Sequence, residues 1–297
     1  MNAKSQRIIL IRPRIQNMMH KMPNPPIGLG YLASSLQAAG YRVYILDLAV
    51  RNITNEVLIK FIKKQKPLFV GVSALTAYYM DMITLCKQIK QELPELTVVV
   101  GGVHPSSLPK LSLAETGADI VVIGEGERTV VELARILENP HGDLNMVKGI
   151  CFNQEDDLII TAERELIEDL DSIPIPAWQK INPNKYPKIP HGLLVIHGKV
   201  APILSTRGCP FKCHYCASCR FWHQRIRFRD PVKIVDEIEY LHKKFGIKEI
   251  HFWDDNLTMK KTHIIGICRE VLKRGLNLSF ATPNGIRVDT LDREVLG

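Results

Sequence analysis

Five short apolar runs, each followed by a helical pattern, recur between residues 7 and 139. The runs are rich in Val and Ile and apolar throughout, which indicates strands buried on both faces in a parallel sheet that helices cover. Gly40 is placed to end the first helical pattern and Thr54 to cap the second. The runs are RIILIR, RVYILDL, LFVGVSA, LTVVVGG and DIVVIGEG. The repeat predicts an α/β fold with a doubly wound, five-stranded parallel sheet of the Rossmann or flavodoxin type.

Ligands of a doubly wound domain bind at the carboxyl ends of its strands. Four loops rich in Gly, Pro or Ser are expected there, at residues 23–30, 73–76, 101–107 and 124–127. Any one of them could be no more than a turn, but four on the same edge favour a binding edge, where glycine lets the backbone approach a ligand closely. The candidate binding residues are Ser73, Leu75, Thr76, Gly101, Gly102, His104 and Glu125.

The rest of the chain has a different pattern. Residues 149–162 predict a hairpin that turns at Asp156 and Asp157, and the prolines between residues 174 and 190 predict an irregular connector. Three further strands are expected, at APILST, KEIHFWD and LSFATPNG, with helices at 231–244 and 261–274. We therefore expect an α/β domain at 1–140, a hairpin and connector at 141–198, and the first half of a parallel β/α barrel at 199–297.

The overall composition is that of a globular protein, with 45% hydrophobic and 24% charged residues. The sequence has no apolar run long enough for a membrane span and no signal-peptide pattern at its start, so we expect a cytoplasmic protein. It contains seven cysteines. In a reducing compartment, clustered thiols more often bind metal or do chemistry than form disulfides.

Three of these cysteines, Cys209, Cys213 and Cys216, have the spacing C-x3-C-x2-C directly after a predicted strand. Three thiolates on one loop can bind three irons of a four-iron cluster and leave the fourth iron open. A structural zinc site needs a closed set of four ligands, usually as two separated pairs. Cys219 or His214 could complete four, but no second pair lies at a suitable distance. We therefore favour the cluster, and we expect Cys268, on a helical pattern, in the core.

The net charge is +8, and basic and aromatic residues alternate just after the cysteines. Such a run could stack nucleic-acid bases. It could equally be a solvated loop or bind the anionic group of a small substrate, and we favour this second interpretation because no nucleic-acid-binding module accompanies the run. The run consists of Arg220, Phe221, Trp222, Arg225, Arg227, Phe228 and Arg229.

The segment CPFKCHYC, with Tyr215 directly before the third cysteine, resembles the cluster loop of radical S-adenosylmethionine (SAM) enzymes. The resemblance implies a [4Fe-4S] cluster whose open iron is chelated by SAM, and one-electron cleavage of SAM to a 5'-deoxyadenosyl radical. It also implies that Asp254 and Asp255 lie near the SAM ammonium group, although capping of the next helix would explain them as well. Arg287 is implied as a partner of the SAM carboxylate or of the substrate.

The combination with an α/β domain is similar to the cobalamin-binding radical SAM enzymes. Ser73 and Leu75 resemble the S-x-L element, and Gly101 and Gly102 the G-G element, that line the nucleotide tail of cobalamin in those proteins. The D-x-H-x-x-G motif that supplies a lower cobalt ligand elsewhere is absent, and His20 lacks the aspartate that would orient it. The resemblance thus implies cobalamin without a protein histidine below the metal.

This resemblance implies an enzyme that methylates, cyclises or rearranges an unactivated carbon of a small molecule, with electrons from a donor such as flavodoxin or ferredoxin. The residues do not identify a catalytic side chain or the substrate. One alternative is an RNA-modifying radical SAM enzyme, but the methylthiotransferases carry a second cluster on three N-terminal cysteines, and here only Cys86 and Cys151 precede residue 200. Another is a fragment that binds a corrinoid or a cluster without turnover, because the sequence stops soon after the third barrel strand.

Overall fold

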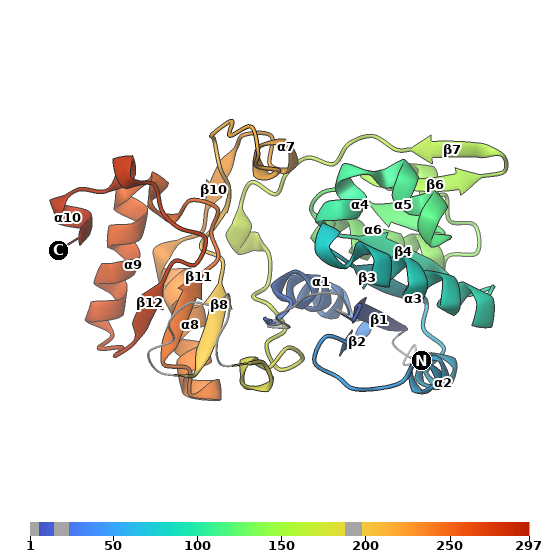
Figure 1. The fold of residues 1–297 in the computed structure, drawn as a ribbon, viewed down its shortest axis with the longest axis horizontal. Helices are drawn as coiled ribbons and strands as arrows, with labels where there is room; N and C mark the ends of the chain where they lie inside the picture. The colour runs from blue at the N-terminus through green and yellow to red at the C-terminus, as the bar shows by residue number, and fades with distance from the viewer. Residues whose placement is uncertain (1–5, 15–23, 188–197, 297) are drawn as a thin grey trace. The chain divides into compact units, whose positions relative to one another are not determined.

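The computed structural model describes residues 6–14, 24–187 and 198–296. The chain divides into two compact units (Figure 1). The first contains Gly28–Leu166, Pro174–Lys180 and the N-terminal strand, and the second contains Ile167–Ile173 and Ile181–Gly297. No helix in the described part of the chain has the length and apolar character needed to cross a membrane.

The first unit is built on a seven-stranded sheet of order β2-β1-β3-β4-β5-β6-β7. The five predicted strands are confirmed and are parallel, in the flavodoxin-like order. The predicted hairpin forms too, but it joins the sheet as two antiparallel strands and turns one residue earlier, at Glu155 and Asp156. The strands are β1 (Arg7–Arg12), β2 (Arg42–Asp47), β3 (Phe69–Ser73), β4 (Val98–Gly101), β5 (Ile120–Val122), β6 (Ile150–Gln154) and β7 (Asp157–Ile160).

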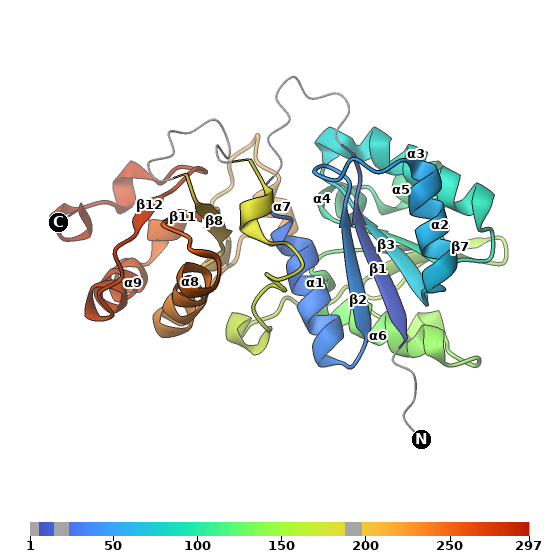
Figure 2. The same cartoon turned by 90° about the horizontal axis from the view of Figure 1, so that it is seen from below.

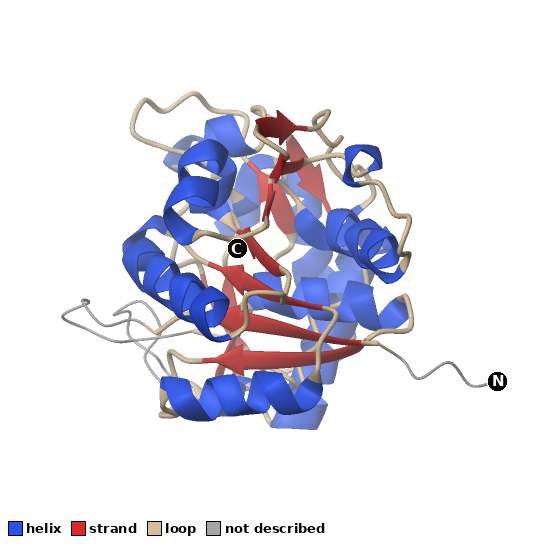
Figure 3. Ribbon diagram, turned by 90° about the vertical axis from the view of Figure 1, so that its right-hand side faces the viewer, coloured by secondary structure: helices blue, strands red, loops and turns tan. Residues whose placement is uncertain are grey.

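Helices cover both faces of this sheet (Figures 2 and 3). On one face the side chains of α2, α3 and α5 form a core with β1, β3 and β4, and α1 and α6 lie on the other. Burial on both faces explains the uniformly apolar strands: Ile8, Ile9, Leu10 and Ile11 are each at most 1% exposed. The helices are α1 (Ile27–Ala38), α2 (Asn55–Gln65), α3 (Tyr79–Glu92), α4 (Val103–Ser107), α5 (Pro109–Thr116) and α6 (Gly126–Glu138).

Local signals set several helix ends. The hydroxyl of Thr54 accepts a hydrogen bond from the Val57 amide and caps α2, as predicted. Helices α4 and α5 were not predicted: residues 101–107, which contain α4, were expected to be a loop, and no element was assigned to the residues of α5. Proline is compatible with the first turn of a helix, and Pro109 occupies that place in α5. Pro109 was therefore a usable signal for the start of α5.

The second unit contains three parallel strands in the order β12-β11-β8, with helices α8 and α9 packed together beside them (Figure 2). Both helices end within one residue of their predicted bounds. The expectation that Cys268 lies in the core was wrong, because it is exposed on α9. The elements are β8 (Val200–Ile203), β11 (Glu249–Phe252), β12 (Ser279–Ala281), α8 (Pro231–Phe245), α9 (Lys261–Lys273) and the short α10 (Arg293–Leu296).

An antiparallel ribbon follows β8. Strand β9 (Thr206–Gly208) pairs with β10 (Ile226–Phe228), and the chain between them carries the cysteines and the short helix α7 (Ser218–Phe221). The expected single strand at APILST is thus wrong at its end, since the chain turns at Leu204 and Ser205. Gly208 has a φ of +98°, and a Cβ there would lie 2.0 Å from the carbonyl oxygen of Arg225, so only glycine allows this pairing.

Candidate functional site

The cluster loop, residues 209–216, lies between the two strands of the ribbon. Cys209, Cys213 and Cys216 are free thiols and partly exposed, and the amide of Cys216 donates to the carbonyl of Cys213 at 3.0 Å. No three His, Cys, Asp or Glu side chains in the described ranges converge as ligands of a single metal ion. A four-iron cluster does not require such convergence, because each thiolate binds a different iron. The donor set therefore fits a cluster with one open iron.

Asp254, at the end of β11, anchors the chain just before the cluster loop. It is 2% exposed, and its Oδ1 accepts hydrogen bonds from the Ser205 amide at 3.0 Å, the Ser205 hydroxyl at 2.8 Å, the Thr206 hydroxyl at 2.6 Å and the Thr206 amide. Burial raises the pKa of Asp254 to about 6, although these hydrogen bonds act in the opposite direction. Its position makes it a support of the turn between β8 and β9.

Asp255 holds the other side of the loop. Its Oδ1 accepts a hydrogen bond from the hydroxyl of Ser218 at 3.0 Å, in the chain just after Cys216. Burial raises the pKa of this carboxyl as well. Neither aspartate caps the following helices, whose N-cap positions are occupied by Asn256 and Lys260. The two neighbouring carboxylates thus fix the entry and the exit of the cluster loop, and the capping alternative was wrong.

Arg287, after β12, lies against the middle of the cluster loop. Its guanidinium carbon is 3.8 Å from the ring centroid of Phe211, between Cys209 and Cys213. Arg287 also donates two hydrogen bonds to Asp289, at 2.9 and 2.7 Å. These bonds raise the pKa of Arg287, and the charges of Cys213 and Cys209 act in the same direction. The structure therefore brings Arg287 together with the cysteine loop. The side chain of Tyr215, which the resemblance places beside the third cysteine, is 93% exposed.

In the first unit, the predicted binding residues lie at the carboxyl ends of β3 and β4. Ser73 and Gly101 are register partners at the ends of these strands. His104 Nδ1 lies 3.1 Å from the hydroxyl of Thr76, and its ring packs on Tyr79 with centroids 3.7 Å apart. Burial lowers the pKa of His104. Leu75 is 47% exposed, Glu125 is buried at the start of α6, and His20 lies outside the described residues.

Gly102 has a packing role that the sequence did not suggest. Its φ is +105°, and a Cβ there would lie 2.7 Å from the carbonyl oxygen of Ala74 and 2.9 Å from the hydroxyl of Ser73. The glycine is therefore required because the loops after β3 and β4 pack directly on each other. Close approach of a ligand, the reason given by the sequence pattern, is not needed to explain it.

Two family comparisons match the two units. The B12 binding domain family matches residues 20–134, and the radical SAM superfamily matches residues 203–296, which include the cluster loop. The chain joins a B12-binding domain to a radical SAM domain. It is 32% identical over 298 residues to an uncharacterized methyltransferase of Pyrococcus horikoshii, covering 98% of this chain and 62% of that protein.

A second relative is the anaerobic magnesium-protoporphyrin IX monomethyl ester cyclase of Synechocystis, which is 31% identical over 295 residues, 97% of this chain and 57% of the cyclase. The chain thus spans about three fifths of the length of these relatives. Two solved structures share the fold. The methyltransferase TsrM from Kitasatospora setae has a TM-score of 0.74 at 21% identity, covering 91% of this chain and 51% of TsrM. The cobalamin-dependent enzyme OxsB has a TM-score of 0.76 at 20% identity, covering 93% and 38%.

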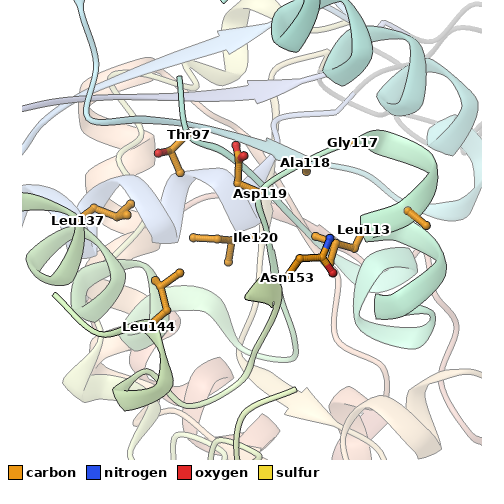
Figure 4. A pocket seen from close by; sticks show the side chains of 10 residues that line it. Thr97, Leu113, Gly117, Ala118, Asp119, Ile120, Leu137, Leu144 and Asn153 are labelled. Atoms are coloured by element: carbon orange, nitrogen blue, oxygen red, sulfur yellow. The ribbon is translucent and has the colours of Figure 1, made fainter. Parts of the chain in front are cut away.

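The B12-binding domain contains a cavity of about 490 Å³ whose lining residues include Thr97, Asp119 and Ile120 (Figure 4). Thr97 precedes β4, and Asp119 and Ile120 stand at the start of β5, so the cavity is at the amino ends of these strands. Asp119 is paired there with Lys90 at 2.9 Å. None of the predicted binding residues lines this cavity.

The arginine and aromatic run of the radical SAM domain is only partly exposed, and two of its four arginines are buried. Arg229 is buried and pairs with Glu237 at 2.7 Å. Arg227 is buried as well, and it donates to the carbonyl of Ile167, while the exposed Arg225 pairs with Glu168. These arginines hold the ribbon to the chain around it, and the run does not form a continuous exposed surface for nucleic acid.

Several residues that support the cluster loop were not predicted. Ser205, Thr206 and Ser218 donate to the two aspartates, Phe211 stacks under Arg287, and the amide of Asn284 donates to the carbonyl of Trp253. The contact between Asp254 and Ser205 joins residues 49 positions apart. The spacing of residues in one sequence does not predict which distant residues pair in this way. The hydroxyl residues beside the cysteines did indicate that hydrogen-bond donors lie next to the loop.

Proposed function

We propose that this chain supplies the cofactor-binding parts of a radical SAM enzyme that uses cobalamin to methylate or cyclise an unactivated carbon of a small molecule. The observation that carries the proposal is the trio of free cysteines on a loop held at both ends by Asp254 and Asp255. The printed names of the relatives, a methyltransferase and a cyclase, support the reaction class.

In this proposal, Cys209, Cys213 and Cys216 each bind one iron of a [4Fe-4S] cluster. When bound, the cluster would supply the electron that cleaves SAM, and cobalamin would carry the methyl group. Tyr215 and Arg287 would contact SAM. Asp255 would contact SAM from beside the end of the loop. Asp254 would hold in place the turn that precedes the loop. The nucleotide tail of cobalamin would lie along Ser73, Leu75, Thr76, Gly101, Gly102, His104 and Glu125.

The remaining parts of the proposal concern the cellular setting. The cluster would receive its electron from a flavodoxin or a ferredoxin. Free, partly exposed thiols that must bind iron suit a reducing compartment, so we propose that the protein works in the cytoplasm. The corrinoid would belong to residues 1–140 and the cluster to residues 199–297, with residues 141–198 as the connection.

Anaerobic reconstitution with iron, sulfide and hydroxocobalamin tests the proposal. We expect about four irons per chain, retained corrinoid, and 5'-deoxyadenosine when SAM and dithionite are added. C213A should lose the iron and the SAM cleavage, whereas C268A, a change at an exposed thiol on α9, should lose neither. Retained corrinoid with no iron would leave only a carrier, cluster and corrinoid without SAM cleavage would leave a binding protein, and one zinc per chain would refute the scheme.

A further inference from the structure

The contact between Arg287 and the cluster loop brings a permanent positive charge next to the cysteines. The guanidinium carbon lies 3.8 Å from the centroid of Phe211, which stands between Cys209 and Cys213 in the sequence. A planar guanidinium stacks well on an aromatic ring. The stacking restricts the long arginine side chain, so that its charge stays in one position.

The charges of Arg287 and of the cysteines act on each other. A cysteine binds iron as a thiolate, and a guanidinium keeps its positive charge in a protein. Because Arg287 stacks on the residue that stands between Cys209 and Cys213, its charge stabilises negative charge on the loop when the cluster is bound. Asp289 opposes this effect, because its carboxylate is bound to the same guanidinium through two hydrogen bonds, at 2.9 and 2.7 Å.

We propose that Arg287 raises the reduction potential of the cluster on Cys209, Cys213 and Cys216, and that Asp289 moderates this effect. The inference rests on the proposed function, because it requires the cluster. Reduction adds one electron, taken from a low-potential one-electron donor, and makes the cluster more negative by one charge. A nearby cation favours that state and a nearby carboxylate disfavours it, since charge near a cluster is one of the levers on its potential.

This role differs from simple contact with SAM. If Arg287 only bound the SAM carboxylate, its replacement would change the affinity for SAM and leave the potential of the SAM-free cluster unchanged. If it acts on the cluster, the potential changes before any SAM is added. Arg287 then acts on the cluster through its charge. Replacing Arg287 and replacing Asp289 should therefore shift the reduction potential in opposite directions.

The test is an anaerobic redox titration of the reconstituted, SAM-free protein, followed by electron paramagnetic resonance of the reduced cluster. We expect R287M to make the potential more negative by roughly a tenfold change in the reduction equilibrium, which is about 59 mV for one electron. R287K should fall between R287M and the wild type, because it keeps the charge and loses the planar stack. D289N should shift the potential in the positive direction. R269M, at an exposed arginine on α9, controls for the change in net charge.

The outcomes separate this inference from the proposed function. A wild-type chain that binds no four-iron cluster would refute the proposed function and the inference together. Equal potentials for wild type, R287M and R269M, with the same iron content, would refute the inference alone. A shift in the same direction for R287M and D289N would also refute it, because opposite charges must act with opposite sign.

Discussion

At the residue scale, the support of the cluster loop depends on one buried carboxyl group. Asp254 accepts hydrogen bonds from both Ser205 and Thr206, and burial still raises its pKa to about 6. The folded state therefore holds a proton on Asp254 at pH values where the unfolded chain, with a pKa near 3.9, has lost it. The hydrogen bonds thus favour the carboxylate form of Asp254, and burial favours the protonated form more strongly.

The raised pKa of Asp254 predicts a pH dependence of stability. Between about pH 4 and pH 6 the native state binds more protons than the unfolded state, so the contribution of Asp254 falls as the pH rises, by about 3 kcal/mol in all. We expect the wild type to lose stability relative to D254N across this window in urea unfolding of the iron-free chain. His263, whose pKa burial lowers to about 4, contributes the opposite slope, but it is present in both proteins. A constant difference between the two would contradict the assignment.

At the element scale, the antiparallel ribbon of β9 and β10 presents the cysteines, and Gly208 makes the pairing possible. A Cβ at residue 208 would collide with the carbonyl of Arg225, and the φ of +98° disfavours any side chain. We expect G208A to cost about 3 kcal/mol at the ribbon and to lower the iron bound on reconstitution. G275A is the matched control, since Gly275 also has a positive φ but an open surrounding. Equal iron content in both variants would contradict this role.

The elements differ in how far the sequence predicts them. The five parallel strands and helices α8 and α9 were predicted because each has a local signal: an apolar run, a cap or a periodic face. The ribbon was missed because its strands have three residues each and pair across the whole cluster loop. The cysteines themselves were identified from spacing alone. Asp254, Asp255 and Arg287 were named from the resemblance, but their contacts with the cluster loop were not predicted, because these contacts join distant parts of the chain.

At the scale of the whole molecule, each unit builds its predicted site from its own contacts. The loops after β3 and β4 pack on each other through Gly102, whereas Asp254, Asp255 and Arg287 support the cluster loop within the second unit. These two sets of contacts have no residue in common. We therefore expect the two cofactors to be lost independently when one set is disturbed.

The variants G102A and C213A test this expectation in the full chain. G102A forces a Cβ against the Ala74 carbonyl and should cost about 2 kcal/mol locally, so the chain should lose retained corrinoid and keep its iron. C213A should lose iron and keep corrinoid. G40A is the control for G102A, because Gly40 also has a positive φ, at +95°, nothing lies within 4 Å of its added Cβ, and it lies outside the proposed binding loops. Loss of both cofactors in either variant would show that the two sites depend on each other.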